Sequence, residues 1–150
     1  MPGENESTTR LKIDVSEFQT GIRNAQRQIR LANAEFQNAA SSMENWKEST
    51  EGIQAKIRQL TQTLDAQEDI LDNLEKEYQR VVEANGELSQ EAINVKIKIE
   101  QQKAAINKTN REISQYRQSL EEVSDESGNL EDSMENASEG LENASEGLED

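Results

Sequence analysis

The sequence contains no cysteine and no histidine. Disulfide bonds, thiolate or imidazole metal sites and catalytic triads that use histidine are therefore excluded. Long apolar runs are also absent, so no segment reads as a membrane span or as the apolar region of a secretion signal. We accordingly expect no cofactor, no metal and no membrane segment.

Hydrophobic residues are scarce, at 32% of the chain, and aromatic residues make up only 3%. With 31% charged residues, this composition is typical of disorder or of elongated helices rather than of a compact core. The net charge is −15, and the last 30 residues hold twelve acidic and no basic groups. Such acidity repels phosphate, so we expect no nucleic-acid partner.

One local group of basic residues stands against this acidity. We interpret it as a solvated helix face, although it could contact an anionic surface. Its members are Lys96, Lys98, Lys103, Lys108 and Arg111.

What the sequence does contain is one apolar stripe. From Phe18 to Leu148, positions spaced alternately four and three residues apart form a single frame of 38 positions, of which 32 are apolar. All five aromatic residues lie on it. A repeat of seven keeps one helix face against a partner helix, whereas a helix on a globular core follows about 3.6 residues per turn and leaves this frame. The stripe therefore predicts an all-α protein of long coiled-coil helices.

Three regions follow one another along the chain. Residues 1–10 are short and polar, which indicates a flexible arm. Residues 11–123 form a strand plus a coiled-coil helical region, in which residues 11–15 alternate like a short strand and Ser16 with Gln19 matches a capping box. We expect the first helix to run from about Glu17 to Lys47. An acidic tail follows them.

Residues 124–150 form an acidic, low-complexity tail. It contains the sequence ENASEGL twice and keeps the apolar frame, but its glycines disfavour a helix by about 1 kcal/mol each relative to alanine. We expect this tail to be weakly helical or disordered. The sequence stops within this repeating pattern, so we expect that residue 150 is not the natural C-terminus.

Two interruptions of the helical signal leave two architectures open. The weaker one lies at Ser49–Gly52, where a serine or threonine can cap a new helix. The stronger one lies at residues 85–89, where Gly86 suits the end of a helix and a serine three residues later suits the next N-cap. That break predicts a helical hairpin with arms of residues 50–84 and 90–123. The frame nevertheless crosses both breaks unchanged, which favours one extended oligomeric coil.

The stripe predicts association between copies. Apolar residues also lie off the stripe, at Ile70, Val82, Ile93 and Ile97, and such extra burial suits three or more helices. We therefore expect a homo-oligomer, with a trimer favoured. Six polar stripe positions weaken this assignment: Thr50, Gln67, Asn85, Gln102, Thr109 and Ser127. The residues expected to carry association are Phe18, Ile22, Phe36, Trp46, Ile57, Leu60, Leu71, Leu74, Tyr78, Ile99, Ile106, Ile113, Tyr116 and Leu120.

Catalysis is not indicated. The chain has many carboxylates but little apolar material with which to build the water-excluding pocket that tunes a catalytic pKa. One partial match to a calcium loop begins at Asp125, but Leu130 stands where that loop needs glycine and Asn136 where it needs a bidentate glutamate. We therefore expect no enzyme activity.

Three stretches, in order, resemble the N-terminal region of phage tail tape measure proteins of the type found in phages and prophages of Gram-positive bacteria. They are LKIDVSEFQTGIRNAQRQIR, NWKESTEGIQAKIRQLTQTL and EYQRVVEANGELSQEA. The resemblance covers about residues 11–123. It rests on the strand with its capped helix near Phe18 and Ile22, on the junction Trp46–Gly52 and on the junction Asn85–Ser89.

In that family the long helical protein lies inside the tail tube, its length sets the tail length, tube subunits polymerise around it, and it leaves the tail ahead of the DNA. The resemblance implies a location in the lumen of a phage tail, and in the bacterial cytoplasm during assembly. It also implies tail tube proteins, tail-tip proteins and a tail assembly chaperone as partners. At about 1.5 Å per residue, residues 18–148 as one helix would span roughly 195 Å and could act as a ruler.

The residues by themselves leave a second interpretation open. A cellular coiled-coil adaptor or spacer, which scaffolds partners through its helices and its acidic tail, fits the same composition and periodicity.

Overall fold

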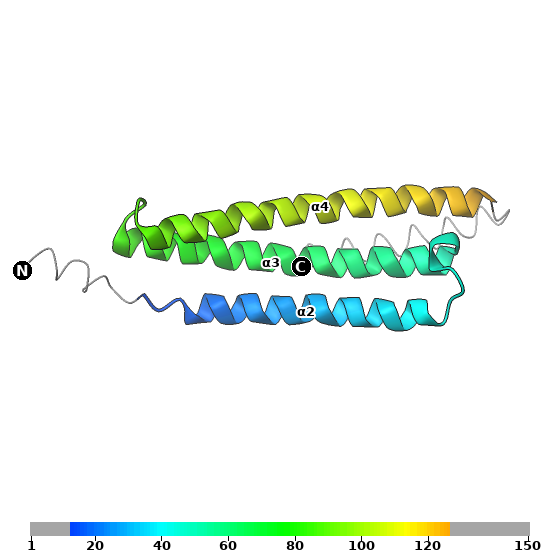
Figure 1. Ribbon diagram of the computed structural model, residues 1–150, viewed down its shortest axis with the longest axis horizontal. Helices are drawn as coiled ribbons and strands as arrows, with labels where there is room; N and C mark the ends of the chain where they lie inside the picture. Colours follow the sequence, from blue (N-terminus) through cyan, green and yellow to red (C-terminus); the bar gives the residue numbers. More distant parts are fainter. Residues whose placement is uncertain (1–12, 127–150) are drawn as a thin grey trace, which may run out of the picture.

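The computed structural model describes residues 13–126. In them the chain forms three long α-helices, α2 (Ser16–Ser41), α3 (Thr50–Asn85) and α4 (Gln90–Glu126), with a short 3-10 helix, η1 (Trp46–Glu48), before α3. Successive helices run in opposite directions, and α3 lies between α2 and α4 (Figure 1). The predicted all-α class is confirmed for this part of the chain.

The chain reverses at both interruptions of the helical signal. At the second, Gly86 has a φ of +91°, a conformation that costs glycine little, and its N–H donates to the carbonyl oxygen of Val82 at 2.9 Å. The hydroxyl of Ser89 then accepts from the N–H of Ala92 at 3.1 Å and caps α4. The hairpin architecture is therefore correct, and a continuous helix through residues 85–89 is wrong.

The first interruption also uses a serine cap. The hydroxyl oxygen of Ser49 accepts from the N–H of Gly52 at 2.9 Å, so Ser49 rather than Thr50 is the N-cap of α3. Asn45 plays the same part for η1, because its side-chain oxygen accepts from the N–H of Lys47 at 3.3 Å. Local hydrogen bonds thus set the start of each element in this connection.

The start of α2 differs from the sequence prediction. Residues 13–15 form no strand, and the other two residues of the predicted strand lie outside the described residues. A single strand is not stable without a partner strand, and the described residues supply none. Ser16 is the first helical residue rather than the cap, and no side chain caps the helix at Val15. Instead, the carboxylate of Asp14 accepts hydrogen bonds from the N–H, at 3.0 Å, and from the hydroxyl of Ser16.

Helix α2 also ends earlier than predicted, at Ser41 rather than near Lys47. The hydroxyls of Ser41 and Ser42 donate to the backbone carbonyls of Asn38 and Ala39, at 2.7 and 2.9 Å. These side chains satisfy carbonyl groups that the next helical turn would otherwise use. Two consecutive serines therefore help to end the helix here.

The core lies along α3 in three clusters. Beside the start of α3, Ile53 and Ile57 pack with Leu120 of α4; next along the helix, Leu60 and Leu64 pack with Ile113. Toward the α3–α4 turn the core is shared by all three helices. That third cluster consists of Ala25, Ala66, Ile70, Leu74, Val95 and Ile99. Full burial of one such large aliphatic side chain stabilises the fold by about 1.5–3 kcal/mol.

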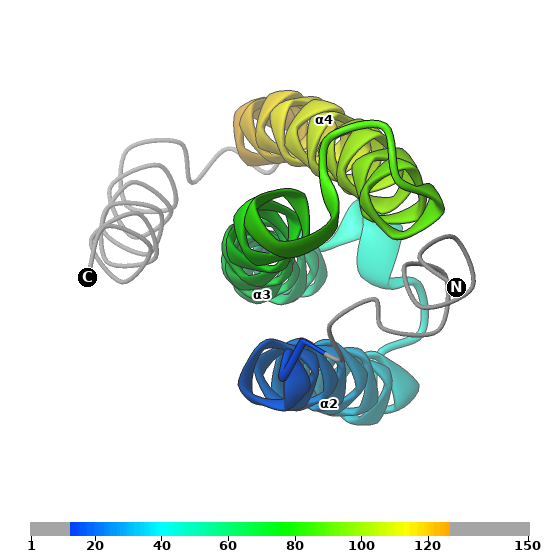
Figure 2. The same ribbon diagram turned by 90° about the vertical axis from the view of Figure 1, so that its left-hand side faces the viewer.

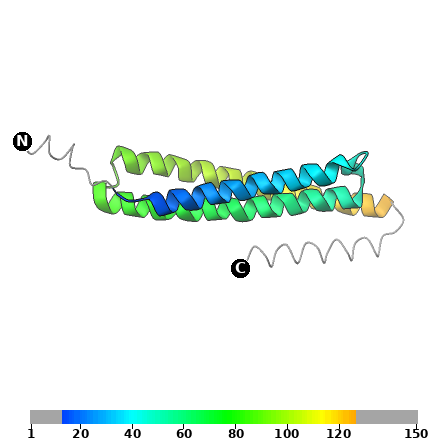
Figure 3. The ribbon, with the colours of Figure 1, turned by 90° about the horizontal axis from the view of Figure 1, so that it is seen from below.

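Helix α2 approaches α3 through alanines. Ala25 and Ala32 are almost completely buried, and the two helices run side by side (Figure 3). Small side chains allow close approach of two helix backbones. Viewed along the bundle, α2 and α4 lie on different sides of α3, and each of them packs mainly against it (Figure 2). Of the helices described, none is long and apolar enough to cross a membrane.

Candidate association surfaces

All fourteen residues predicted to carry association pack within this single chain. Seven are buried, and seven are partly buried on the edges of the three core clusters or at the junction with η1. The buried ones are Phe18, Ile57, Leu60, Leu74, Ile99, Ile113 and Leu120. The partly buried ones are Ile22, Phe36, Trp46, Leu71, Tyr78, Ile106 and Tyr116. Association between copies through these residues stays a prediction, since one chain already buries much of their surface.

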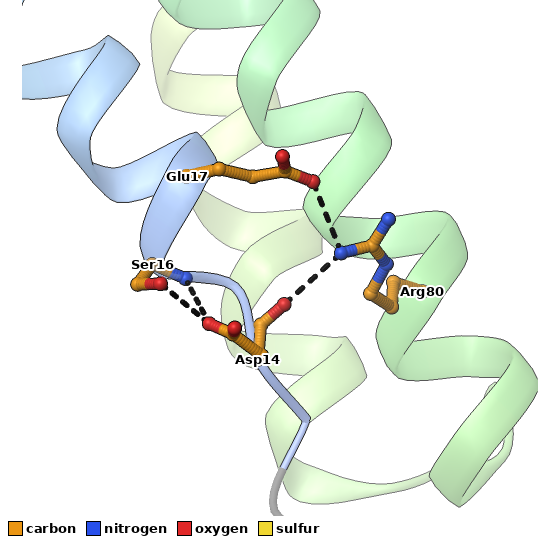
Figure 4. Close-up of polar contacts among 4 residues, drawn as sticks. All are labelled: Asp14, Ser16, Glu17 and Arg80. Carbon is orange, nitrogen blue, oxygen red and sulfur yellow. Dashed lines mark hydrogen bonds and ion pairs between the residues drawn. The ribbon is translucent and has the colours of Figure 1, made fainter.

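The start of α2 is held to α3 by Arg80. Its Nη1 atom donates to the backbone carbonyl of Asp14 at 3.0 Å and to the carboxylate of Glu17 at 3.2 Å (Figure 4). The guanidinium also lies 4.6 Å from the ring centre of Phe18. The hydrogen bonds from Ser16, together with the nearby Arg80 charge, hold the pKa of the Asp14 carboxyl below its ordinary value. Sequence reasoning missed this contact because its partners are more than 60 residues apart.

An aromatic junction closes the other end of the bundle. The ring of Trp46 meets Phe36 of α2 edge to face at 4.9 Å, and Tyr116 of α4 at 5.7 Å. The ammonium of Lys56 lies 4.8 Å from the Phe36 ring centre and 5.9 Å from that of Trp46. Burial lowers the pKa of Lys56, while Glu112 opposes that change. The junction therefore ties η1 to all three helices.

Helix α4 carries apolar residues that the fold leaves uncovered. Ile93 and Ile97 are 46% and 50% exposed, and Leu88 in the preceding turn is 88% exposed. Of the apolar residues off the stripe, Ile70 is buried in this chain, at 7% exposed, whereas burial of Ile93 and Ile97 between copies stays a prediction. These two lie outside the stripe, and α4 uses its stripe positions to pack on α3. Their position off the stripe was the feature of the sequence that could have indicated their exposure.

A hollow lies between α2 and α3. It has a volume of about 390 Å³, and it is lined by Gln28, Leu31, Glu35, Gln62, Asp65, Ala66 and Asp69. Leu31 is 53% exposed beside these acids. Partial burial and the charge of Asp69 raise the pKa of Asp65, and Glu68 nearby is raised by burial and by both aspartates. The hollow therefore combines one exposed apolar side chain with several carboxylates that repel one another.

The features described above are contacts between helices and exposed helix surfaces. No group of three or more potential metal ligands gathers anywhere in residues 13–126. Comparison of the chain with protein-family models, with curated proteins and with solved structures gave no match. The surfaces themselves are therefore the basis for any functional proposal.

Proposed function

We propose that the chain is the N-terminal region of a phage tail tape measure protein, a structural protein of the virion without enzymatic activity. One observation supports this most. The two junctions on which the family resemblance rests, Trp46–Gly52 and Asn85–Ser89, coincide with the two points at which the chain reverses. The resemblance therefore follows boundaries of the fold and not only a shared helical composition.

The folded bundle is much shorter than one continuous helix of the same residues, so this segment would add less to the length of a tape measure protein. The longest helix has 37 residues, so the folded bundle extends about 56 Å at about 1.5 Å per residue. Opened into one helix, residues 16–126 would span roughly 167 Å. We infer that this segment acts as a folded module to which tail tube proteins, tail-tip proteins and an assembly chaperone bind.

A coiled-coil trimer of this chain would need stripe residues that are free to contact other copies. Residues such as Ile57 and Ile113 are buried in the single chain, so they can pair with other copies only if the helices separate or exchange partners. Such an exchange of identical elements between copies is a low-cost route to an oligomer.

Deletion of the gene from the phage or prophage that encodes this chain tests the proposal. We expect particles with absent or irregular tails in electron micrographs, and restoration of normal tails when the gene is supplied in trans. Mass spectrometry of purified wild-type tails should detect peptides of the chain. Normal tails in the deletion strain, with no such peptides in wild-type tails, would exclude the tail role and favour the adaptor alternative.

A further inference from the structure

The turn between α3 and α4 contains a chemically labile pair of residues. Asn85 is the last residue of α3, and it is the one asparagine of the sequence that a glycine follows. Asparagine is a thermolabile residue, because the backbone nitrogen of the next residue can attack its side-chain amide carbon. Glycine in that next position has no side chain to hinder the attack. The pair Asn85–Gly86 is therefore the strongest candidate for this reaction in the chain.

Both partners of the attack are accessible in the structure. Asn85 is half-buried, and its side-chain amide forms no hydrogen bond with another residue of the described part of the chain. Gly86 is exposed, and among the described residues no atom beyond its chain neighbours lies within 4 Å of the point where a Cβ would stand. By contrast, the side-chain amide of Asn73 is held by the backbone carbonyl of Asp69 at 2.9 Å.

Two hydrogen bonds restrain this turn. The N–H of Gly86, whose nitrogen is the attacking atom, donates to the carbonyl oxygen of Val82 at 2.9 Å. The hydroxyl of Ser89 donates to the carbonyl oxygen of Gly86 at 2.8 Å. While these bonds are formed, the Gly86 N–H is directed to Val82 and not to the Asn85 side chain. Attack therefore requires the last turn of α3 to open, and helix ends open at a small free-energy cost.

We propose that Asn85 is a site of spontaneous deamidation in the folded protein, reached by transient opening of this turn. The Gly86 nitrogen loses its proton to solvent and bonds to the Asn85 side-chain carbon, and the side-chain nitrogen takes up a proton and leaves as ammonia. Water then opens the cyclic succinimide at either of its carbonyl carbons. The products are aspartate, or isoaspartate, in which the main chain runs through the former side chain. Water is consumed and ammonia is released, with no change of oxidation state.

Either product disturbs the end of α3. The helix carbonyls give the last turn a partial negative charge, and this turn contains no basic residue to pair with a new carboxylate. Glu83 and Glu87, both exposed, lie within two residues of Asn85 and add to the repulsion. Isoaspartate also adds a carbon atom to the main chain, so the restraints on Gly86 no longer fit. The hairpin therefore loses stability as the protein ages, whether or not it belongs to a phage tail.

Peptide mass spectrometry of the full chain tests the proposal with an internal control. Trypsin cleaves after Arg80 and after Lys96, so one peptide of residues 81–96 contains both Asn85 and Asn94. Asn94 precedes a valine, whose branched side chain hinders the attack. During days of incubation of the folded protein at neutral pH, a growing fraction of this peptide should become heavier by about 1 Da. Fragment ions should place the change at Asn85, and an isoaspartate methyltransferase should label the product.

Two serine variants separate opening of this turn from unfolding of the whole chain. Ser89→Ala removes the hydroxyl that holds the Gly86 carbonyl, whereas Ser49→Ala removes the matching N-cap at the other end of α3. Ser89→Ala should raise the rate of deamidation about fivefold, and Ser49→Ala should leave it unchanged. Unfolding the wild type in urea should raise the rate about tenfold or more, because the restraint on Gly86 is then lost.

Two asparagine variants report on the effect of the product. Asn85→Asp reproduces one product, and its urea unfolding midpoint should lie below that of the wild type. Asn110→Asp makes the same change at an exposed position inside α4 and should leave the midpoint unchanged. Asn85→Gln, whose longer side chain closes the ring far less readily, should gain no mass at this position.

Several results would overturn the proposal. One is deamidation of Asn85 in the folded protein no faster than that of Asn94. Others are equal rates with and without urea, or equal effects of Ser89→Ala and Ser49→Ala, since the turn would then not control the reaction. An unchanged unfolding midpoint of Asn85→Asp would contradict the loss of hairpin stability.

Discussion

Gln102 Nε2 donates a hydrogen bond to the backbone carbonyl of Gln67 at 3.0 Å, and so joins two polar positions of the stripe across the α3–α4 hairpin. Thr50 and Asn85, two further polar positions, are the first and last residues of α3. Four of the six polar positions of the stripe therefore mark the ends of α3 and one polar pair between α3 and α4. Of the other two, Thr109 is buried on α4, where its hydroxyl donates to the backbone carbonyl of Ala105 at 3.1 Å, and Ser127 lies outside the described residues.

The polar pair of Gln67 and Gln102 costs stability. The side-chain oxygen of Gln67 is buried without a hydrogen-bond partner among the described residues. Replacing both glutamines, as Gln67→Leu with Gln102→Leu, removes the unsatisfied group and adds apolar burial. We expect the free energy of unfolding in urea to rise by about 1–2 kcal/mol. A loss of stability would show that the pair is needed to fit the two helices together.

Gly52 permits the close approach of η1 to α3. A Cβ atom at this position would lie 2.2 Å from the backbone oxygen and 2.6 Å from the Cα of Trp46. Gly52→Ala should therefore displace the only tryptophan and destabilise the fold by about 2 kcal/mol or more, as measured by urea unfolding with tryptophan fluorescence.

Gly21→Ala is the matched control for that substitution. The three atoms nearest to its Cβ would all belong to the amide end of the Asn73 side chain, which can move away, and alanine favours a helix by about 1 kcal/mol over glycine. We expect little change or a small gain in stability. Equal losses for the two variants would contradict the role given to Gly52.

The two serine caps should contribute independently. Ser49→Ala and Ser89→Ala each leave a helix N–H without its side-chain acceptor, so each should lower the free energy of unfolding by about 1 kcal/mol. The caps lie at opposite ends of α3, so the double variant should lose the sum. Ser114→Ala, at an exposed position inside α4, should not destabilise the protein. A double variant that loses far more than the sum would show that one end of the bundle depends on the other.

Burial of Glu77 makes stability depend on pH. Its carboxyl lies on α3 with its pKa raised by burial, an effect that Lys98 partly offsets. Because the folded-state pKa lies above the unfolded one, this group stabilises the fold fully only below the unfolded pKa, and that stabilisation is lost as pH rises through the folded pKa. Glu77→Gln should therefore be more stable than the wild type at pH 7, and this advantage should shrink as the pH is lowered into the acidic range.

The exposed neighbour Glu75 provides the control for this pH dependence. Glu75→Gln removes the same charge from a solvated position of α3. Urea unfolding at several pH values should show little difference between this variant and the wild type. If Glu77→Gln has no larger effect than Glu75→Gln at pH 7, the burial of Glu77 is not costly.

The stripe was correct about which faces are buried, and it left open whether they are buried within one chain or between copies. Ile57 and Ile113 were expected to meet other copies, and in the structure they pack within one chain. Stripe residues on both sides of the turn at residues 85–89 pack against each other, so the same frame continues although the chain reverses direction. An unbroken frame therefore does not distinguish a hairpin from a continuous coil.

The sequence by itself determined the helical class and two candidate breaks, at Ser49–Gly52 and at residues 85–89, since Ser49, Gly86 and Ser89 act through hydrogen bonds and backbone angles within a few residues. It did not determine what each helix packs against, because burial of an isoleucine lowers the free energy equally in its own chain or in another. Only the tertiary structure decided this, and a connection of four residues between α3 and α4 favours the partner that is already tethered. The same arrangement left Ile93 and Ile97 uncovered, because α4 can turn only one side toward α3.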